Sequence, residues 1–522
     1  MTPVLHKLSI ELISEEMPPF AQEEVERSFF IDFKKHLDLM GFECTNFNIY
    51  TTAKLIFLEI NDLIINSSAY ITKIRGPKVD ANQNSIYSFC KKYQISTSSL
   101  EIKNNYYFYQ QVSTPENSLI QVIKEFLSSY KWYKSVRWSN YDLYWIRPLK
   151  GICCKLDGKL LDFQFFHLTN QTQHLAHRQL GHQLPFGRDS DICQDYRNKG
   201  VIISRNERKE MVLNSFKDLN FSCNDEKLLT EIIGLVDYPR VVSLPEINIF
   251  PLPFFIASTA LKNHQKIFCV ANSEETITVY IVVDRCNDNY LQEVTAGYKR
   301  VIDSRIADAL YLFKEDLKDF ESGALQEKSN NIIIHKAIGT VKDQASRMNK
   351  FAQIFSPQHE VILEECKLDL SSKIVNEFPE LRGHFSSYLI QTKSSVSVKD
   401  NQKKCHIIKN FYNLENLDEQ ELGYPLSEKF DYLVGLMIAN TKVKGSYDPY
   451  QLKRTAKAIY NVFTRAYKRE ELSDCILPCV AAFICIYKYT DKEISYSILN
   501  DTDHAIIDKI TSFILERYTG KK

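Results

Sequence analysis

Basic residues crowd the segment between residues 441 and 469, where they could hold an anionic ligand. Eight lysines and arginines stand there against one acid, Asp448, so eight minus one leaves a local charge of +7. The cations are Lys442, Lys444, Lys453, Arg454, Lys457, Arg465, Lys468 and Arg469. Such density is typical of a surface that binds a phosphate backbone. We predict that the first seven contact nucleic acid.

One helix must position most of these cations. Asp448-Pro449 predicts its start, as an N-cap residue followed by proline at the first helical position. Apolar residues then recur at helical spacing and predict a buried stripe: Leu452, Ala456, Ile459, Phe463 and Ala466. The cations fall largely off this stripe, towards solvent. An ordinary solvated basic helix would show the same pattern, and this alternative stays open.

No other cluster predicts a catalytic or metal site. His167, His174, His177 and His182 have spacings that match no closed zinc pattern. The sequence contains none of the glycine-rich phosphate loops, the G-x-S-x-G elbow or the H-E-x-x-H motif. We therefore assign no catalytic residue and no metal ligand. The chain is predicted to be a binding or scaffolding protein before it is a self-sufficient enzyme.

Composition predicts a soluble, multidomain protein. The 522 residues are 44% hydrophobic and 25% charged, and 65 basic side chains cancel 65 acidic ones. No stretch approaches the roughly 18 apolar residues of a membrane span. The 13 cysteines form no C-x-x-C pair and are interpreted as reduced core thiols, including Cys475, Cys479 and Cys485 on an apolar helix. These features predict a cytoplasmic location without membrane contact.

Hydrophobic periodicity predicts mixed α/β structure towards the N-terminus. Leu8, Ile10 and Leu12 alternate as in a strand, and a helix is predicted from Phe20 to Met40, ended by Gly41. Thr114-Pro115 predicts a helix start, and Asp157-Gly158 predicts a hairpin.

The second half is predicted to be mainly helical. Four prolines between residues 237 and 256 predict a connector, followed by strands at 267–271 and 277–284. A helix is predicted from Gln292 to Leu317, and beyond residue 331 almost every segment has helical period.

An ordered series of segments makes the sequence resemble a known family, the β subunit of the bacterial heterotetrameric glycyl-tRNA synthetase. The match runs along nearly the whole chain. Its segments are EEMPP (15–19), TTAKLIFLEI (51–60), RGPKVDA (75–81), VRWSNYDLYWIRPLKGI (136–152), LVDYPRVV (235–242), NHQKIF (263–268), KRVIDSRIADALYLFKEDLK (299–318), NEFPELRG (376–383) and KGSYDPYQLKR (444–454).

The resemblance implies a division of labour. In this family the α subunit carries the class II active site and uses ATP, with Mg, to form glycyl-adenylate. The β subunit is thought to hold tRNA and to complete the α2β2 enzyme. This chain would then bind no cofactor, be inactive alone, and offer the basic helix to glycine tRNA.

The family's middle helical region is similar to HD-type phosphohydrolase domains, whose metal chemistry needs a His-Asp pair. No His-Asp dipeptide occurs here, and SEKFD (427–431) stands where relatives show a pattern like ADKLD. The resemblance therefore implies a recycled scaffold without metal ligands. Family members usually continue into a helical anticodon-binding domain, of which this chain is expected to contain only the opening helices.

Together these inferences predict an α+β protein of four regions. They are an N-terminal α/β region with room for more than one domain (1–220), a mixed strand and helix region of tRNA-binding type (221–320), a helical HD-like domain without metal ligands (321–470) and the start of a truncated anticodon-binding-type domain (471–522). Two other functions stay open. One is a stand-alone RNA-binding or scaffold protein derived from that subunit, and the other is an HD-type phosphohydrolase.

Overall fold

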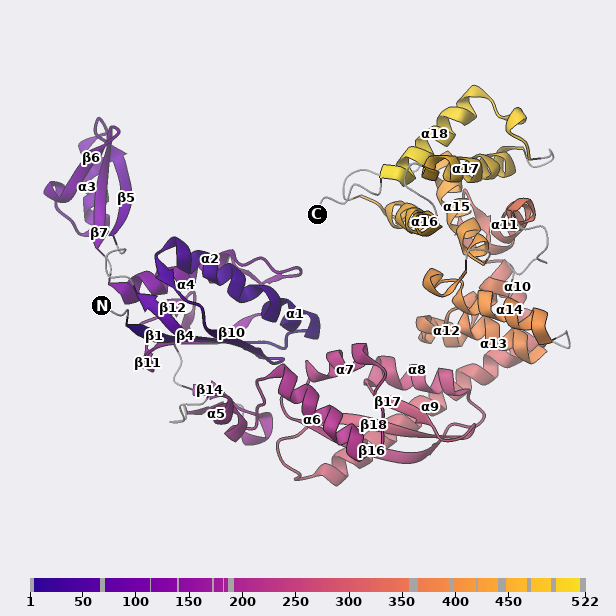
Figure 1. Cartoon of the computed structure of the whole chain (residues 1–522), viewed down its shortest axis with the longest axis horizontal. Coiled ribbons are helices and arrows are strands. Elements are labelled where there is room, and N and C mark those ends of the chain that lie inside the picture. Colours follow the sequence, from indigo (N-terminus) through magenta and orange to yellow (C-terminus); the bar gives the residue numbers. More distant parts are fainter. Residues whose placement is uncertain are drawn as a thin grey trace. The chain divides into compact units, whose positions relative to one another are not determined.

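The computed structural model consists of two compact units. Figure 1 labels their helices and strands. The first contains Met1–Pro245, Lys266–Val270 and Thr278–Tyr298, and the second contains Glu246–Gln265, Ala271–Ile277 and Lys299–Lys522. The structure describes residues 4–65, 71–112, 114–138, 140–170, 173–181, 183–185, 192–355, 365–393, 398–418, 421–439, 447–466, 471–489 and 494–516. Within these ranges, no helix is both long and apolar enough to cross a membrane.

A six-stranded antiparallel sheet forms the centre of the first unit. Its order is β11-β10-β1-β4-β2, and β3 also pairs with β4. The strands are β1 (Leu5–Ser14), β2 (Phe42–Glu43), β3 (Phe47–Thr51), β4 (Leu55–Ile65), β10 (Leu149–Leu156) and β11 (Lys159–Leu160). Leu8, Ile10 and Leu12 of β1 share one hydrophobic core with Phe33 and Phe126. These two rings come from α2 (Phe30–Leu39) and α4 (Pro115–Ser129), so the alternation predicted for the first strand is confirmed.

The first predicted helix is confirmed with a change of helix type in its middle. It runs through α1 (Pro19–Glu24), a π-helical turn (Val25–Phe29) and α2, and Gly41 follows with φ +78°. Thr114 caps α4, since its hydroxyl accepts a hydrogen bond from the Asn117 N–H at 3.3 Å. Both local signals therefore work as predicted.

The hairpin at Asp157-Gly158 is confirmed, because both residues have positive φ (+48° and +76°). Its second strand is only the two residues of β11. The Asn170 side chain accepts from the Cys154 N–H at 2.7 Å and donates to the Leu161 carbonyl at 2.7 Å. Short strands and one helix complete this part: β8 (Val136–Arg137), β9 (Tyr144–Trp145), β12 (Gln164–Phe165), β13 (Leu168–Thr169), β14 (Gln173–Leu175), β15 (Gln183–Pro185) and α5 (Ile192–Asn198).

A small α/β module lies between β4 and α4 in the chain. It consists of β5 (Ile71–Lys78), α3 (Gln83–Tyr93), β6 (Leu100–Lys103) and β7 (Tyr106–Val112). The three strands form an antiparallel sheet in the order β5-β7-β6.

The proline-rich stretch from 237 to 256 is not a connector, and this prediction is wrong. It contains β16 (Pro239–Asn248) and the first residues of α8 (Phe254–Gln265). β16 is an edge strand in the order β16-β18-β17, with β17 (Phe268–Ala271) and β18 (Thr276–Asp284). An edge strand tolerates Pro245, which has no N–H to donate. The strands predicted at 267–271 and 277–284 are confirmed.

The second unit is mostly helical, as predicted. Its main helices are α9 (Leu291–Glu321, starting in the first unit), α10 (Ala324–Asn330), α11 (Val341–Phe355), α12 (Lys373–Glu377), α13 (His384–Lys393), α14 (Val398–Asn410), α15 (Gly423–Ile438), α16 (Leu452–Ala466), α17 (Leu472–Lys488) and α18 (Asp501–Leu515). A short pair, β19 (Ile333–His335) and β20 (Gly339–Thr340), interrupts them. Leu433, Ile459, Phe483 and Ile510 show how α15 to α18 share one core. The mixed α/β class is therefore confirmed, while the predicted domain boundaries stay predictions.

Candidate nucleic-acid interface

The helix that carries the predicted cations begins three residues later than predicted. α16 starts at Leu452, and Asp448 lies outside it. The Asp448 carboxylate nevertheless accepts hydrogen bonds from the backbone N–H groups of Leu452 and Lys453, both at 2.9 Å. Gln451 before the helix has φ +54°, in the left-handed region. Asp448 therefore caps the helix, but the prediction that Pro449 occupies its first position is wrong.

The buried stripe of α16 is confirmed over its first two turns. Leu452, Ala456 and Ile459 are fully buried in the core shared with α15, α17 and α18. Phe463 is only partly buried, whereas Val462 is buried beside Leu417 and Leu422. The apolar face therefore turns slightly towards Val462 at its C-terminal end. The Ala466 side chain lies outside the part that the structure describes.

Four of the seven predicted contact residues lie in the described part of the chain. Arg454, Lys457 and Arg465 are exposed and Lys453 is half-buried. The Arg454 guanidinium donates to Gln451 Oε1 at 3.3 Å. Arg465 donates to the Leu414 carbonyl at 3.1 Å. Lys442, Lys444 and Lys468 lie outside the described residues.

Lys453, Arg454 and Lys457 form a group, which we call the α16 basic face. They occupy the first two turns of α16, where the helix dipole is also positive. Cations at this end oppose the dipole, at about 0.3–1 kcal/mol each at low ionic strength. Asp448 offsets part of this repulsion. An anion bound here would interact favourably with both the side chains and the helix end.

The predicted histidine cluster does not form one site. His177 is fully buried, and its Nε2 lies 3.3 Å from Asp284 Oδ1. His167 stacks on the Tyr141 ring at 5.0 Å. The side chains of His174 and His182 lie outside the described set. Among the residues that the structure describes, no group of three or more His, Cys, Asp or Glu side chains is placed to hold a metal ion.

The two carboxylates of the SEKFD segment bind cations in the helical unit. Asp431 is fully buried and accepts from Arg347 Nε at 2.6 Å, from Arg347 Nη2 at 3.1 Å and from Gln344 Nε2 at 2.9 Å. Glu428 pairs with the buried Lys367 at 2.6 Å. Burial opposes ionisation of Glu428, but the Lys367 ammonium outweighs it and lowers the pKa of this carboxyl. Arg347 and Gln344 therefore join α11 to α15, whereas Lys367 joins the segment Glu365–Ser371 to α15.

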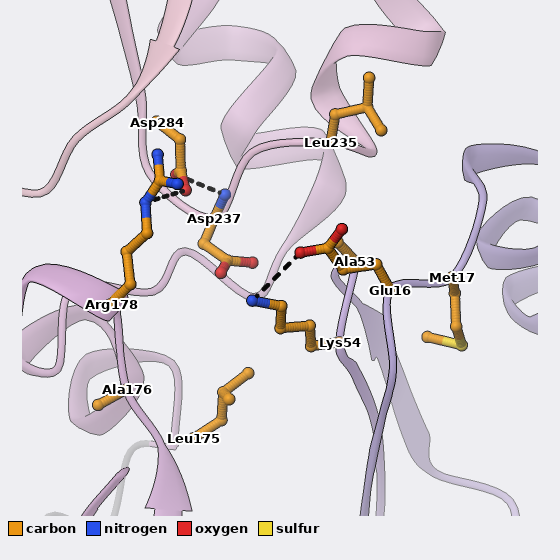
Figure 2. Close-up of a pocket in the computed structure, with 10 residues that line it drawn as sticks. All are labelled: Glu16, Met17, Ala53, Lys54, Leu175, Ala176, Arg178, Leu235, Asp237 and Asp284. Carbon is orange, nitrogen blue, oxygen red and sulfur yellow. Dashed lines mark hydrogen bonds and ion pairs between the residues drawn. The ribbon is translucent and has the colours of Figure 1, made fainter. Parts of the chain in front are cut away.

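A charged pocket in the first unit was not predicted (Figure 2). Three segments that carry the family resemblance meet there, through Met17, Lys54 and Asp237. Its volume is about 140 Å³, and its lining residues are Glu16, Met17, Ala53, Lys54, Leu175, Ala176, Arg178, Leu235, Asp237 and Asp284. The Met17 N–H donates to the Ala53 carbonyl at 2.6 Å and fixes two of these segments together.

The pocket contains three carboxylates and two cations. Figure 2 shows Lys54 Nζ paired with Glu16 at 3.4 Å and Arg178 with Asp284 at 3.9 Å. Asp237 lies between these pairs, and its pKa is raised by burial and by the nearby Asp284 charge. Acids outnumber bases, so a phosphate group fits this pocket poorly. The ion pairs connect residues far apart in the sequence, which is why no local motif indicated them.

Comparison with known proteins identifies the class of the chain as an aminoacyl-tRNA synthetase subunit. The model of the family described as glycyl-tRNA synthetase beta subunit matches residues 8–521. The chain belongs to this family.

Its relatives include the glycine–tRNA ligase beta subunits of three Rickettsia species. That of Rickettsia felis is 28% identical, over 97% of this chain and 80% of the relative. That of Rickettsia canadensis is 28% identical over 98% of this chain and 77% of the relative. That of a Rickettsia bellii strain is 28% identical over 88% of this chain and 72% of the relative. The resemblance read from the sequence is thereby confirmed.

Proposed function

We propose that this chain is the tRNA-binding subunit of a cytoplasmic glycine–tRNA ligase and carries no active site for amino-acid activation. A separate α subunit would complete an α2β2 enzyme and use ATP with Mg, while this chain binds no cofactor. The chain would hold glycine tRNA while the α subunit attaches glycine. Family membership supports the reaction class.

The α16 basic face carries the tRNA part of the proposal. The apolar stripe of α16 is buried in the helical core, so Arg454 and Lys457 lie on the solvent side of the helix. The positive helix end adds to the positive potential that a bound anion would meet there, although it disfavours the cations themselves. The surface therefore suits the phosphates of an RNA backbone.

Substitution of the α16 basic face tests this proposal through salt dependence. Replacing Lys453, Arg454 and Lys457 by Gln should lower tRNA affinity, and should reduce the slope of log K against log salt by about two to three if each cation meets one phosphate. The helix should survive, since Gln is nearly as good a helix former as Lys or Arg.

A matched control removes three charges elsewhere. Lys217, Lys227 and Lys314 are exposed, so their replacement by Gln should leave the slope unchanged. If the α16 variant keeps its full affinity and slope, the basic face is solvated surface and the tRNA site lies elsewhere.

We also propose that the helical region is an HD-like scaffold and not a phosphohydrolase. The support comes from Asp431, which Arg347 and Gln344 already bind. The Arg347 guanidinium binds both carboxylate oxygens of Asp431, the atoms with which a metal ligand would bind its ion. Metal-dependent phosphatase or nuclease activity of the purified chain would contradict this.

The other alternative is a stand-alone RNA-binding protein. Stable co-purification with a glycyl-tRNA synthetase α subunit would support the ligase, whereas tRNA binding without any such association would support the alternative.

A further inference from the structure

The small module of β5, α3, β6 and β7 is poor in buried residues and rich in aromatic ones. Among its residues with described burial, only Cys90 is buried. Residues 71–112 nevertheless contain five tyrosines and two phenylalanines. Much of this aromatic surface is therefore partly open to solvent, and Tyr87 is 69% exposed.

The strand register divides the side chains of the module between two faces of its sheet. Tyr109 lies opposite Ile74 and Leu100, and its ring contacts the Tyr93 ring of α3 at 6.2 Å. Side chains alternate along a strand, so Tyr107 shares this face with Tyr109. The helix α3 therefore covers this face of the sheet.

The opposite face, which we call the β7 open face, combines aromatic rings with cations. Phe108 lies opposite Arg75 and Glu101, and Tyr106 lies opposite Lys78 and Lys103. Both rings are half-exposed, while these charged residues are exposed. Among these four charged residues, three cations stand against the single acid Glu101, a net charge of +2.

A stack is already formed on this face. The Arg75 guanidinium carbon lies 3.5 Å from the centre of the Tyr106 ring. Lys78 Nζ lies 5.9 Å from the same ring. A guanidinium this close over an aromatic ring can offer its other side to a further planar group, and nucleic-acid bases stack on guanidinium and aromatic planes.

We propose that the β7 open face binds single-stranded nucleic acid. Phe108 and the Arg75–Tyr106 stack would receive unpaired bases, and Lys78 and Lys103 would contact phosphates. A duplex fits less well, because its bases are stacked on one another and unavailable to these rings.

Charge favours nucleic acid over a protein partner for this face. Residues 71–112 contain six basic and two acidic side chains, a net charge of +4 in a neutral chain. Five of the six are lysines, which are depleted at protein–protein interfaces and common where phosphates are bound. This site does not depend on the α16 basic face.

Binding of a short oligonucleotide to the full chain tests the proposal. The probe is a fluorescein-labelled single-stranded RNA of about ten nucleotides, followed by anisotropy. Phe108→Leu keeps an apolar side chain but removes the stacking plane, and should weaken binding about fivefold or more. Arg75→Gln should weaken binding because it removes the guanidinium plane of the stack. Lys78→Gln removes a proposed phosphate contact and should lower the salt slope by about 0.7.

Matched controls come from the other side of the module. Tyr107→Leu removes a ring from the face that α3 covers, and Lys91→Gln removes an exposed charge on α3; both should bind the probe like the unchanged chain.

Three outcomes would overturn the inference. The first is unchanged probe binding in both Phe108→Leu and Arg75→Gln. The second is an equal loss of probe binding in the control variants. The third is that the unchanged chain does not bind the probe, while Phe108→Leu and Arg75→Gln lose association with the α subunit. The last would make the open face a protein-docking surface, and the tRNA proposal for α16 would be unaffected.

Discussion

Cys475, Cys479 and Cys485 differ in burial, although the sequence predicts all three as buried thiols. Cys479 and Cys485 are buried, but Cys475 is only half-buried on α17. Burial raises the pKa of Cys479 to about 12 and also raises that of Cys485. A neutral thiol is a weak nucleophile, so both should react slowly near pH 8.

Alkylation of the native protein checks this order. With iodoacetamide at pH 8, Cys475 should be the first of these three thiols to be modified. Cys479 and Cys485 should become reactive only in urea. Mass spectrometry of the peptides gives the rate at each position. Equal native rates at Cys475 and Cys479 would contradict the packing of α17.

Asp369 predicts a pH dependence of stability. This buried carboxylate accepts from the Gly383 N–H at 2.7 Å, and burial raises its pKa to about 6 from 3.8. The folded state therefore holds the proton more tightly than the unfolded state. The contribution to stability is complete below pH 4 and is lost as pH rises from about 4 to 6, with a maximum of about 3 kcal/mol.

Asp369→Asn should remove this loss. Its free energy of unfolding in urea should exceed that of the unchanged chain at pH 7, and the two should converge near pH 4. Asn can still accept from Gly383, whose φ of +80° suits glycine at this close approach. A variant that is less stable at pH 7 would show that the charged form is favoured here.

At the scale of elements, the pair Arg347–Asp431 holds α11 against α15. Arg347→Met should destabilise the protein by about 3–5 kcal/mol, because it leaves a buried carboxylate without its cation. Arg347→Met combined with Asp431→Leu should regain most of the loss, since neither charge is then buried alone. Urea midpoints measure both. A double variant as unstable as the single one would assign the loss to packing of Arg347 on the Tyr487 ring, 4.5 Å away.

The elements that sequence predicts best are those with local signals. Gly41, Thr114 and the Asp157-Gly158 turn each act within a few residues, and the structure confirms all three. β16 was missed because its prolines suggest a connector, and only its position at a sheet edge makes them acceptable.

The candidate site was predicted only in part, because only some of its features depend on local sequence patterns. The buried stripe of α16 follows from helical spacing, and Leu452 and Ile459 confirm it. The bond between Arg347 and Asp431 joins residues 84 positions apart, and no local pattern contains it. The predicted start of α16 was three residues too early. The Asp-Pro pair suggests that the helix begins directly after Asp448, but the Asp448 carboxylate caps a helix that begins at Leu452.

At the scale of the whole molecule, the proposed division of labour separates two measurable reactions. The α subunit would form glycyl-adenylate, so this chain alone should show no glycine-dependent pyrophosphate exchange, and exchange should appear with the α subunit. Charging of tRNA should then need both subunits. Exchange by this chain alone would contradict the assignment of the active site to its partner.

The α16 triple variant should split these two reactions in the reconstituted enzyme. Loss of three surface contacts at about 0.5 kcal/mol each should raise the KM for tRNA about tenfold. Pyrophosphate exchange should stay unchanged, because adenylate formation involves no contact between Lys453, Arg454 or Lys457 and tRNA. The Lys217, Lys227 and Lys314 variant should match the unchanged enzyme in both reactions. If exchange instead falls in parallel with charging, the α16 basic face acts in assembly with the α subunit, because a surface used only for tRNA cannot affect a reaction that proceeds without it.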